Sequence, residues 1–427
     1  MKILQVSMSD SGGAGIAAVR LHLALLERGV DSKLLTLQKH NEGIKEHYVF
    51  DKIDTSAFPP FTLAMKFVDR VLKRFKLKSD YYRSRRKRYT GGGVQNSEMI
   101  NFSFSEYRLE NHPLVREADI IHLHWVCGGF LDFQRFFKGV TKHVVWTLHD
   151  MNPFTGGCHY AYECLGYLKD CHACPQLEKS GDPSVAEDML SQKVNVLGGQ
   201  ERSLSIVTPS KWLMDCSKKS KLFSKYEHRH IYNIVNEKSF CLTDKASSRE
   251  KLSLPTDKKI ILCIGSLEYP RKGNDILVES LPLLNREDVI LCCVGSVSET
   301  HKDNPSIVQL GYVKDSNKMR DIYNAADIFV LPTRADNFPN TIVEALLSGT
   351  PVASFYVGGV PEQINESNGI LIEKRDPQSV ATSLDQFFDN KGAYKRGVIS
   401  EQASRRYASE GTVNKHIELY GSLCAEH

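Results

Sequence analysis

The stretch KILQVSMSDSGGAGIAAVRLHLALLER, residues 2–28, decides the fold class. Residues 2–8 form a short apolar run typical of a buried strand, and residues 9–15 form a glycine-rich loop. Residues 16–28 carry apolar side chains at helical spacing. The run DSKLLTL at 31–37 supplies a second strand, so the sequence predicts a βαβ unit.

The same pattern recurs along the chain as short apolar runs that end in polar residues, which is typical of buried parallel strands with functional loops at their carboxyl ends. The predicted strands lie within 118–125, 142–150, 204–210, 258–267, 288–296, 306–313, 326–333 and 351–357. The fold class is therefore α/β, with two Rossmann-like, doubly wound sheets in series. We expect a first domain at 1–200, with an insertion near 58–104, and a second domain at 201–402.

Composition narrows the function classes. Of the 427 residues, 41% are hydrophobic and 25% are charged, as in ordinary globular proteins. The formal charge of +4 requires no nucleic-acid partner. The first residues carry no signal-type cleavage region, and no segment approaches the roughly 20 apolar residues of a membrane span. We therefore expect a cytoplasmic protein.

The first loop, Gly12-Gly13-Ala14-Gly15, precedes a helix. Gly13 and Gly15 would let the backbone approach a ligand, and the helix N-terminus would favour a phosphate. A tight turn that needs glycine only for steric reasons is an equal alternative. The spacing GGxG, without an acidic residue at the end of LLTL, disfavours a nicotinamide dehydrogenase.

The segment GSLEYPRKGND at 265–275 presents two cations between a strand that ends at Ile264 and a helix. Arg271 and Lys272 could neutralise a diphosphate leaving group. A solvated basic turn is the alternative.

The segment LPTRADNFPNTIVEALLSGTPV at 331–352 reads as strand, loop and helix. Asp336 falls in the loop and Glu344 inside the helix, where carboxylates can accept hydrogen bonds from sugar or ribose hydroxyls. Asn340 is the expected N-cap, with Thr341 in the first turn, so that free amides point toward the same ligand. Charge stabilisation of the helix N-terminus is the alternative role.

Histidines and cysteines supply two further candidates. His149, in TLHD at the end of a predicted strand, could hydrogen-bond a hydroxyl or stabilise charge, or it could be structural. His122 and His124 share one face of a strand, and we interpret them as structural. A second group has the spacing C-x5-C-x6-C-x2-C and could bind a structural zinc, remain as free thiols or form disulfides: Cys158, Cys164, Cys171 and Cys174.

Together these features resemble glycosyltransferase family 4, the retaining enzymes of GT-B fold. The resemblance rests on GGAG, TLHD, VTPS at 207–210, PRKG at 270–273 and the D-x7-E block with VEALLSGTPV, which occur in family order over nearly the whole chain. It implies an N-terminal acceptor domain, a C-terminal donor domain and a final helix, 403–427, that packs back on the first domain.

The resemblance also implies roles. Lys272 with Arg271 would hold the donor diphosphate, Glu344 the ribose and Asp336 the transferred sugar, while His149 would lie near that sugar. The implied reaction moves a hexose-type sugar, with retention, from a UDP- or GDP-linked donor to a glycan or lipid-diphosphate-linked glycan in exopolysaccharide or O-antigen assembly. No catalytic metal is required. An epimerase of the same fold and a non-catalytic sugar-nucleotide binding protein remain as alternatives.

A basic segment suggests one more partner. Apolar residues recur at helical spacing over 61–75 with lysine and arginine between them, and a dense positive run follows at 81–88. The segment could dock on the anionic inner face of the plasma membrane. A helix packed on the first domain with a solvated charged face is the alternative.

Overall fold

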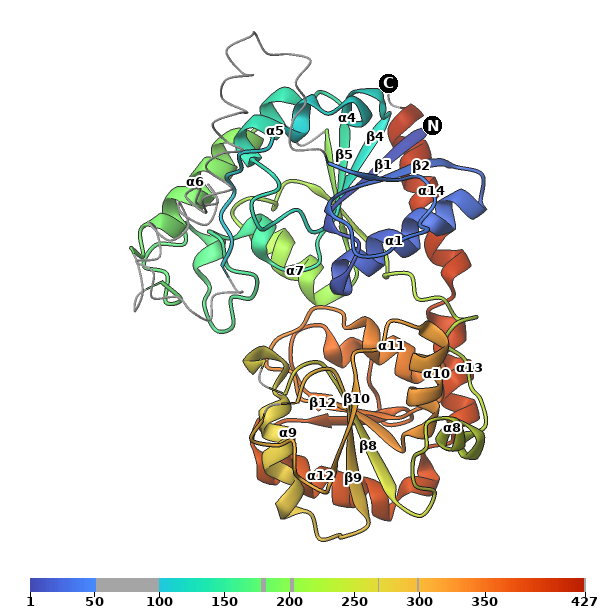
Figure 1. Cartoon of the computed structure of the whole chain (residues 1–427). Coiled ribbons are helices and arrows are strands. Elements are labelled where there is room, and N and C mark those ends of the chain that lie inside the picture. Colours follow the sequence, from blue (N-terminus) through green and yellow to red (C-terminus); the bar gives the residue numbers. More distant parts are fainter. Residues whose placement is uncertain (51–99, 178–181, 200–202, 268, 298, 426–427) are drawn as a thin grey trace, which may run out of the picture. The chain divides into compact units, whose positions relative to one another are not determined.

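The computed structural model describes residues 1–50, 100–177, 182–199, 203–267, 269–297 and 299–425. The chain divides into two compact units, each built around its own parallel sheet (Figure 1). The first unit comprises 1–209, 213–231 and 416–427, and the second comprises 210–212 and 232–415. The fold is thus the predicted α/β class, with two Rossmann-like units.

The first unit holds a seven-stranded sheet with the order β3-β2-β1-β4-β5-β6-β7, in which every neighbouring pair is parallel. Its strands are β1 (Lys2–Ser9), β2 (Asp31–Gln38), β3 (His47–Val49), β4 (Ile120–Leu123), β5 (His143–Thr147), β6 (Leu204–Thr208) and β7 (Glu227–His230). Its helices are α1 (Gly12–Glu27), α4 (Pro113–Glu117), α5 (Phe133–Gly139), α6 (Val185–Leu197), most of α7 (Lys211–Lys219) and the end of α14 (Ser409–Ala425).

The second unit holds a six-stranded parallel sheet with the order β10-β9-β8-β11-β12-β13. Its strands are β8 (Lys259–Ile264), β9 (Val289–Val294), β10 (Ile307–Gly311), β11 (Ile328–Leu331), β12 (Val352–Phe355) and β13 (Gly369–Ile372). Its helices are α8 (Lys245–Lys251), α9 (Asn274–Ser280), α10 (Ser316–Ala325), α11 (Asn340–Leu347), α12 (Pro377–Asp389) and α13 (Arg396–Arg406).

Helices form two layers around the second sheet. On one side α9 packs against α12, and on the other α10 packs against α8 and α11 while α11 packs against α13 (Figure 1). Between these layers, β9 and β11 are apolar and buried over their whole length. A sheet covered on both faces needs such continuous apolar strands, and its functional loops are left at the carboxyl edge.

The domain boundary and the final helix differ from the predicted limits. Strand β6 pairs with β5, and β7 pairs with β6, in the first sheet, so the first unit continues beyond residue 200. The residues after 403 form the end of α13, in the second unit, and then α14, whose last residues from His416 group with the first unit. Most of the predicted insertion at 58–104, and the basic runs at 61–75 and 81–88, lie outside the described residues.

Candidate functional site

The loop after β8 in the second unit carries the predicted cations Arg271 and Lys272, and the loop after β11 carries the predicted carboxylate Asp336. These strands are neighbours, so their carboxyl ends lie side by side. Two hydrogen bonds join the loops: the backbone Arg334 N donates to Arg271 O at 2.8 Å, and the Arg271 side chain donates from Nη1 to Ala335 O at 2.8 Å. Arg334 also forms a bidentate ion pair with Asp275, with N–O distances of 2.9 and 2.6 Å. Sequence reasoning did not single out Arg334.

Gly273 explains why the loop after β8 approaches β11 so closely. Its φ of 68° lies in the left-handed region, and a Cβ at this position would lie 1.8 Å from Pro332 O. Only glycine fits this backbone conformation and this contact. Gly273 thereby fixes the position of Lys272, which precedes it, and of α9, which follows it.

Asp336 faces both cations. Its Oδ2 lies 2.7 Å from Lys272 Nζ and 3.2 Å from Arg271 Nη1. Burial alone would raise the pKa of Asp336, but the neighbouring charges of Lys272 and Arg271 outweigh burial and hold this pKa below its ordinary value. Burial lowers the pKa of Lys272, although Asp336 favours its charged form. The sequence-predicted cations and carboxylate thus form one buried, charged cluster.

Glu344 lies on α11 and is buried, with 9% of its surface exposed. Tyr323 on α10 donates its hydroxyl to Glu344 Oε2 at 3.0 Å, and Tyr323 is itself fully buried. A carboxylate held by a buried partner keeps one orientation, which suits recognition of a ligand hydroxyl pair. Tyr323 gave no signal in the sequence, because its contact depends on how α10 packs against α11.

The prediction that Asn340 is the N-cap of α11 is wrong. Asn340 is the first helical residue, and Pro339 takes the cap position with φ −63° and ψ 115°. The Asn340 Oδ1 accepts from Asn233 Nδ2 at 3.0 Å. A proline at the cap cannot accept a hydrogen bond through its side chain, so no side chain caps this helix. Thr341 follows in the first turn, as predicted.

The glycine loop of the first unit begins α1. A Cβ on Gly15 would lie 2.4 Å from Ser9 O, so glycine is required there for close packing against the end of β1. A Cβ on Gly13 would meet no atom within 4 Å. Asp10 ties this loop to the segment after β2, since its carboxylate accepts from the backbone N–H groups of His40 and Asn41, each at 2.8 Å.

His149 lies directly after β5 in the first unit and joins a buried set of polar side chains. Its Nε2 lies 3.1 Å from Nδ1 of His124, which follows β4. His122 and His124 do share one face, since their rings stack with centroids 4.4 Å apart. Burial lowers the pKa of His149 to about 4 and those of His122 and His124 well below the ordinary value. All three are therefore neutral at pH 7.

Asp150 anchors the long segment that follows β5. Its Oδ2 lies 2.6 Å from Nδ1 of His159 and accepts from Trp125 Nε1 at 2.9 Å. Lys193 on α6 supports the same segment, donating from Nζ to the carbonyl oxygens of Asn152 at 2.7 Å and Thr155 at 2.9 Å. Burial lowers the pKa of Lys193 to about 8. These contacts hold an irregular segment next to His149.

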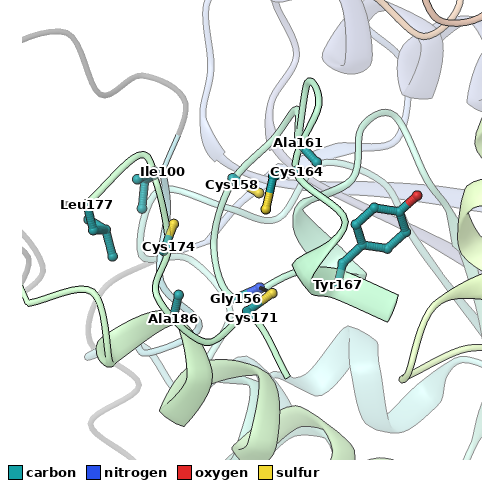
Figure 2. A pocket seen from close by; sticks show the side chains of 10 residues that line it. All are labelled: Ile100, Gly156, Cys158, Ala161, Cys164, Tyr167, Cys171, Cys174, Leu177 and Ala186. Carbon is teal, nitrogen blue, oxygen red and sulfur yellow. Dashed lines mark hydrogen bonds between the residues drawn. The ribbon is translucent and has the colours of Figure 1, made fainter. Parts of the chain in front are cut away.

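The four clustered cysteines lie on this segment and line one small apolar cavity (Figure 2). Backbone N–H groups point at two of the sulfurs, from Gly156 to Cys171 Sγ at 3.3 Å and from Gly166 to Cys164 Sγ at 3.4 Å. Burial raises the pKa of Cys158 to about 12 and that of Cys171 to about 11, so these thiols are neutral here.

The four cysteines do not form a ready coordination set. Across the residues that the structure describes, no group of three or more His, Cys, Asp or Glu side chains is arranged to hold a metal ion. None of the four is in a disulfide. A structural zinc at Cys158, Cys164, Cys171 and Cys174 therefore remains a prediction from their spacing.

Comparisons with known proteins add the family context. Residues 258–390 match the family model described as "Glycosyl transferases group 1". An uncharacterized glycosyltransferase, MJ1607, of Methanocaldococcus jannaschii is 28% identical over 354 residues, which are 75% of this chain and 87% of that protein. A putative colanic acid biosynthesis glycosyl transferase, WcaC, of Escherichia coli is 24% identical over 326 residues, 73% of this chain and 77% of that protein.

Solved structures share the fold. Anabaena Alr3699/HepE in complex with UDP and glucose has a TM-score of 0.63 at 17% identity, covering 99% of this chain and 100% of that one. WaaG, a glycosyltransferase involved in lipopolysaccharide biosynthesis, has a TM-score of 0.61 at 14% identity, covering 98% and 99%. Among the described residues no helix is both long enough and apolar enough to span a bilayer.

Proposed function

We propose that this chain, a glycosyltransferase of the group 1 type with the GT-B fold, transfers a hexose-type sugar with retention from a nucleoside diphosphate sugar. The donor would be linked to UDP or GDP. The acceptor would be a glycan or a lipid-diphosphate-linked glycan in the assembly of a surface polysaccharide such as exopolysaccharide or O-antigen. The chain would meet a lipid-linked acceptor at the inner face of the plasma membrane.

The observation that carries this proposal is the charged cluster of the second unit. Arg271 and Lys272 lie on one loop and face a buried carboxylate, Asp336, on the loop of the neighbouring strand. Two cations held at the carboxyl edge of a parallel sheet suit a diphosphate, because ligands of such sheets bind at this edge. Glu344, oriented by Tyr323, would accept hydrogen bonds from ribose hydroxyls.

Similar proteins support the substrate class. HepE, which shares the fold, binds UDP and glucose in its solved structure. WcaC is named for colanic acid biosynthesis and WaaG for lipopolysaccharide biosynthesis. These names favour a nucleotide-sugar donor and a polysaccharide product for this chain.

The chemistry would depend on stabilising the leaving group. As the bond between the anomeric carbon and the diphosphate oxygen lengthens, negative charge grows on the diphosphate and positive charge on the sugar. Lys272 and Arg271 stabilise the diphosphate, and Asp336 contacts the transferred sugar. The acceptor hydroxyl then bonds to the anomeric carbon on the face that the diphosphate leaves, and its proton passes to the departing phosphate oxygen. Groups that bind charge more tightly in the transition state than in the ground state raise the rate.

Thermal shift with a panel of UDP, GDP, ADP and their hexose conjugates tests the donor site. A ligand that binds only the folded state raises the melting temperature by mass action. We expect a shift with one nucleoside diphosphate that is lost in Lys272→Ala and in Glu344→Ala.

Matched controls for these variants are Lys258→Ala and Glu287→Ala, which make the same changes just before β8 and β9, at the amino ends of the strands. They should keep the shift. Absence of a shift with every nucleotide, or equal loss in the control variants, would contradict the proposed donor site.

A transfer assay separates the proposal from its alternatives. Turnover of the donor with product formation on an acceptor favours a transferase. An epimerase of the same fold would change the sugar of the donor without an acceptor. A sugar-nucleotide binding protein would give the thermal shift and no turnover.

A further inference from the structure

A groove runs along the edge strand of the second sheet. It has a volume of about 1120 Å³ and is lined by β13, by residues just before and after this strand, by the end of β12 and by α13 with the turn before it. Strand β13 is the last in the sheet, so one side of its backbone has no neighbouring strand. All lining residues belong to the second unit, and none of them belongs to the charged cluster.

Few backbone groups of β13 remain for a ligand. Hydrogen bonds from the β12 side reach the carbonyls of Asn368 and Ile372, so the alternating residues Gly369 and Leu371 point away from the sheet. The Gly369 N–H already donates to Asn365 O at 3.0 Å. Within β13, only Leu371 therefore offers both its N–H and its C=O to the groove. A peptide that adds a strand needs several such groups in a row, which disfavours a peptide as the ligand.

Two tyrosines supply apolar surface to the groove. Tyr356 directly follows β12 and is 61% exposed. Tyr394 precedes α13 and is half-buried, with its ring centroid 5.1 Å from that of Phe387. Aromatic rings combine a large apolar face with a polar hydroxyl. The C–H faces of a sugar ring pack well on such surfaces, while the sugar hydroxyls stay available for hydrogen bonds.

The polar lining suits hydroxyl groups and repels anions. Glu366 and Glu373 are exposed carboxylates, and of the described residues that line the groove none is lysine or arginine. Asn365 Oδ1 accepts from the backbone N–H of Ser367 at 2.9 Å, which leaves the Asn365 amide nitrogen as a donor. The groove thus holds acceptors and donors with a net negative charge. Phosphates, nucleotides and anionic lipids are excluded as ligands.

We propose that this groove binds an uncharged oligosaccharide. Tyr356 and Tyr394 would pack against sugar rings, Glu366 and Glu373 would accept hydrogen bonds from sugar hydroxyls, and the Leu371 N–H would donate one. From residue 369 to residue 373 an extended backbone covers about 13 Å, enough for roughly two to three linked sugar rings.

One end of the groove lies at the same sheet edge as the proposed donor site. Tyr356 and Glu373 directly follow β12 and β13, at their carboxyl ends. Two residues after Tyr356, the backbone packs against the charged cluster, since a Cβ on Gly358 would lie 2.0 Å from Asp336 O. The groove leads from there along β13 to the opposite edge. The inference rests on the proposed function only in assigning the bound oligosaccharide to the glycan that serves as acceptor or product.

An array of neutral and anionic oligosaccharides, probed with the full chain in the absence of nucleotide, tests the ligand class. We expect binding to neutral members of three or more sugar units and none to anionic members. Calorimetry with the neutral oligosaccharide that gives the strongest signal then measures the affinity of the variants.

Tyr356→Ala and Glu373→Gln change exposed side chains, so the fold should be retained while the affinity falls about tenfold. Tyr312→Ala is the matched control, because Tyr312 is 77% exposed and follows β10 at the opposite edge of the sheet. It should bind the oligosaccharide as the unchanged protein does.

Lys272→Ala separates this inference from the donor site, since it should lose nucleotide binding and keep oligosaccharide binding. Binding in the groove therefore stands even if no nucleotide produces a thermal shift. No bound neutral oligosaccharide, a preference for anionic ones, or equal affinity in Tyr356→Ala would overturn the inference. So would a dimer in analytical ultracentrifugation that dissociates in Tyr356→Ala, because a second copy would then occupy the groove.

Discussion

At the scale of a single residue, the Asp336 carboxylate affects the two cations of the second unit in two opposing ways. Its carboxylate forms ion pairs with both Lys272 and Arg271, so one negative charge faces two positive ones. A bound diphosphate would need the same cations and would be repelled by the same carboxylate. We therefore expect Asp336→Asn to bind UDP, or whichever diphosphate nucleotide the protein prefers, about tenfold more tightly, equivalent to about 1.4 kcal/mol, while transfer falls.

Isothermal titration calorimetry with the free diphosphate nucleotide measures this effect. Asp257→Asn, at an exposed position before β8, is the matched control and should bind as the unchanged protein does. Weaker binding in Asp336→Asn would mean that the carboxylate is needed to hold the cations in place.

Some residue roles were accessible from the sequence and others were not. Arg271, Lys272 and Asp336 could be grouped because strand ends in a doubly wound sheet meet at one edge. Tyr323 could not be paired with Glu344, because their contact depends on the packing of two helices. Asn340 looked like a cap by residue type, but the extended backbone of Pro339 begins the helix one residue earlier than that pattern suggests.

At the scale of the secondary-structure element, Gly273 is the residue that joins a short 3-10 turn to α9. Replacing it with alanine adds a Cβ 1.8 Å from Pro332 O at a left-handed φ. Backbone strain and overpacking each cost about 1–3 kcal/mol. We therefore expect Gly273→Ala to lower the free energy of unfolding of the second unit by roughly 3 kcal/mol.

Urea unfolding of the full chain, followed by circular dichroism, provides the measurement. Gly392→Ala is the matched control, since a Cβ there meets no atom within 4 Å. If both variants unfold at the same urea concentration, the close approach of the two loops is not a constraint on the fold.

Most strands with an apolar run were predictable, but β13 was not, because its run GILI is only four residues long. Each predicted apolar run contains a strand, from β1 to β12. The sequence did not reveal β3 or β7, because HYV is short and partly exposed and EHRH is polar and half exposed. Both lie at the edges of the first sheet, where one neighbour suffices and an apolar run is not required.

At the scale of the whole molecule, the metal content of the purified protein tests the predicted zinc site. If the cysteines Cys158, Cys164, Cys171 and Cys174 bind a structural zinc, elemental analysis of protein purified without chelator should give about one zinc per chain. The side chains would rotate toward a common centre, and binding would release the thiol protons.

The matched control for the zinc test is Cys424→Ser, which removes an exposed cysteine outside the cluster. It should retain the metal, whereas Cys171→Ser should lose it. Protein without zinc would leave free thiols or disulfides, which mass spectrometry after alkylation distinguishes.

The positions of Tyr420 and His416 also affect when the first unit can complete its folding during translation. They lie near the end of the sequence, yet both are buried in the first unit, and Tyr420 contacts Gln5 and His122 in its central strands. A ribosome adds about 5–20 residues per second and must synthesise the whole second unit before these side chains emerge. The unit that is translated first is therefore completed only after the second unit has been made, and until then Gln5 and His122 lack their contacts with the Tyr420 hydroxyl.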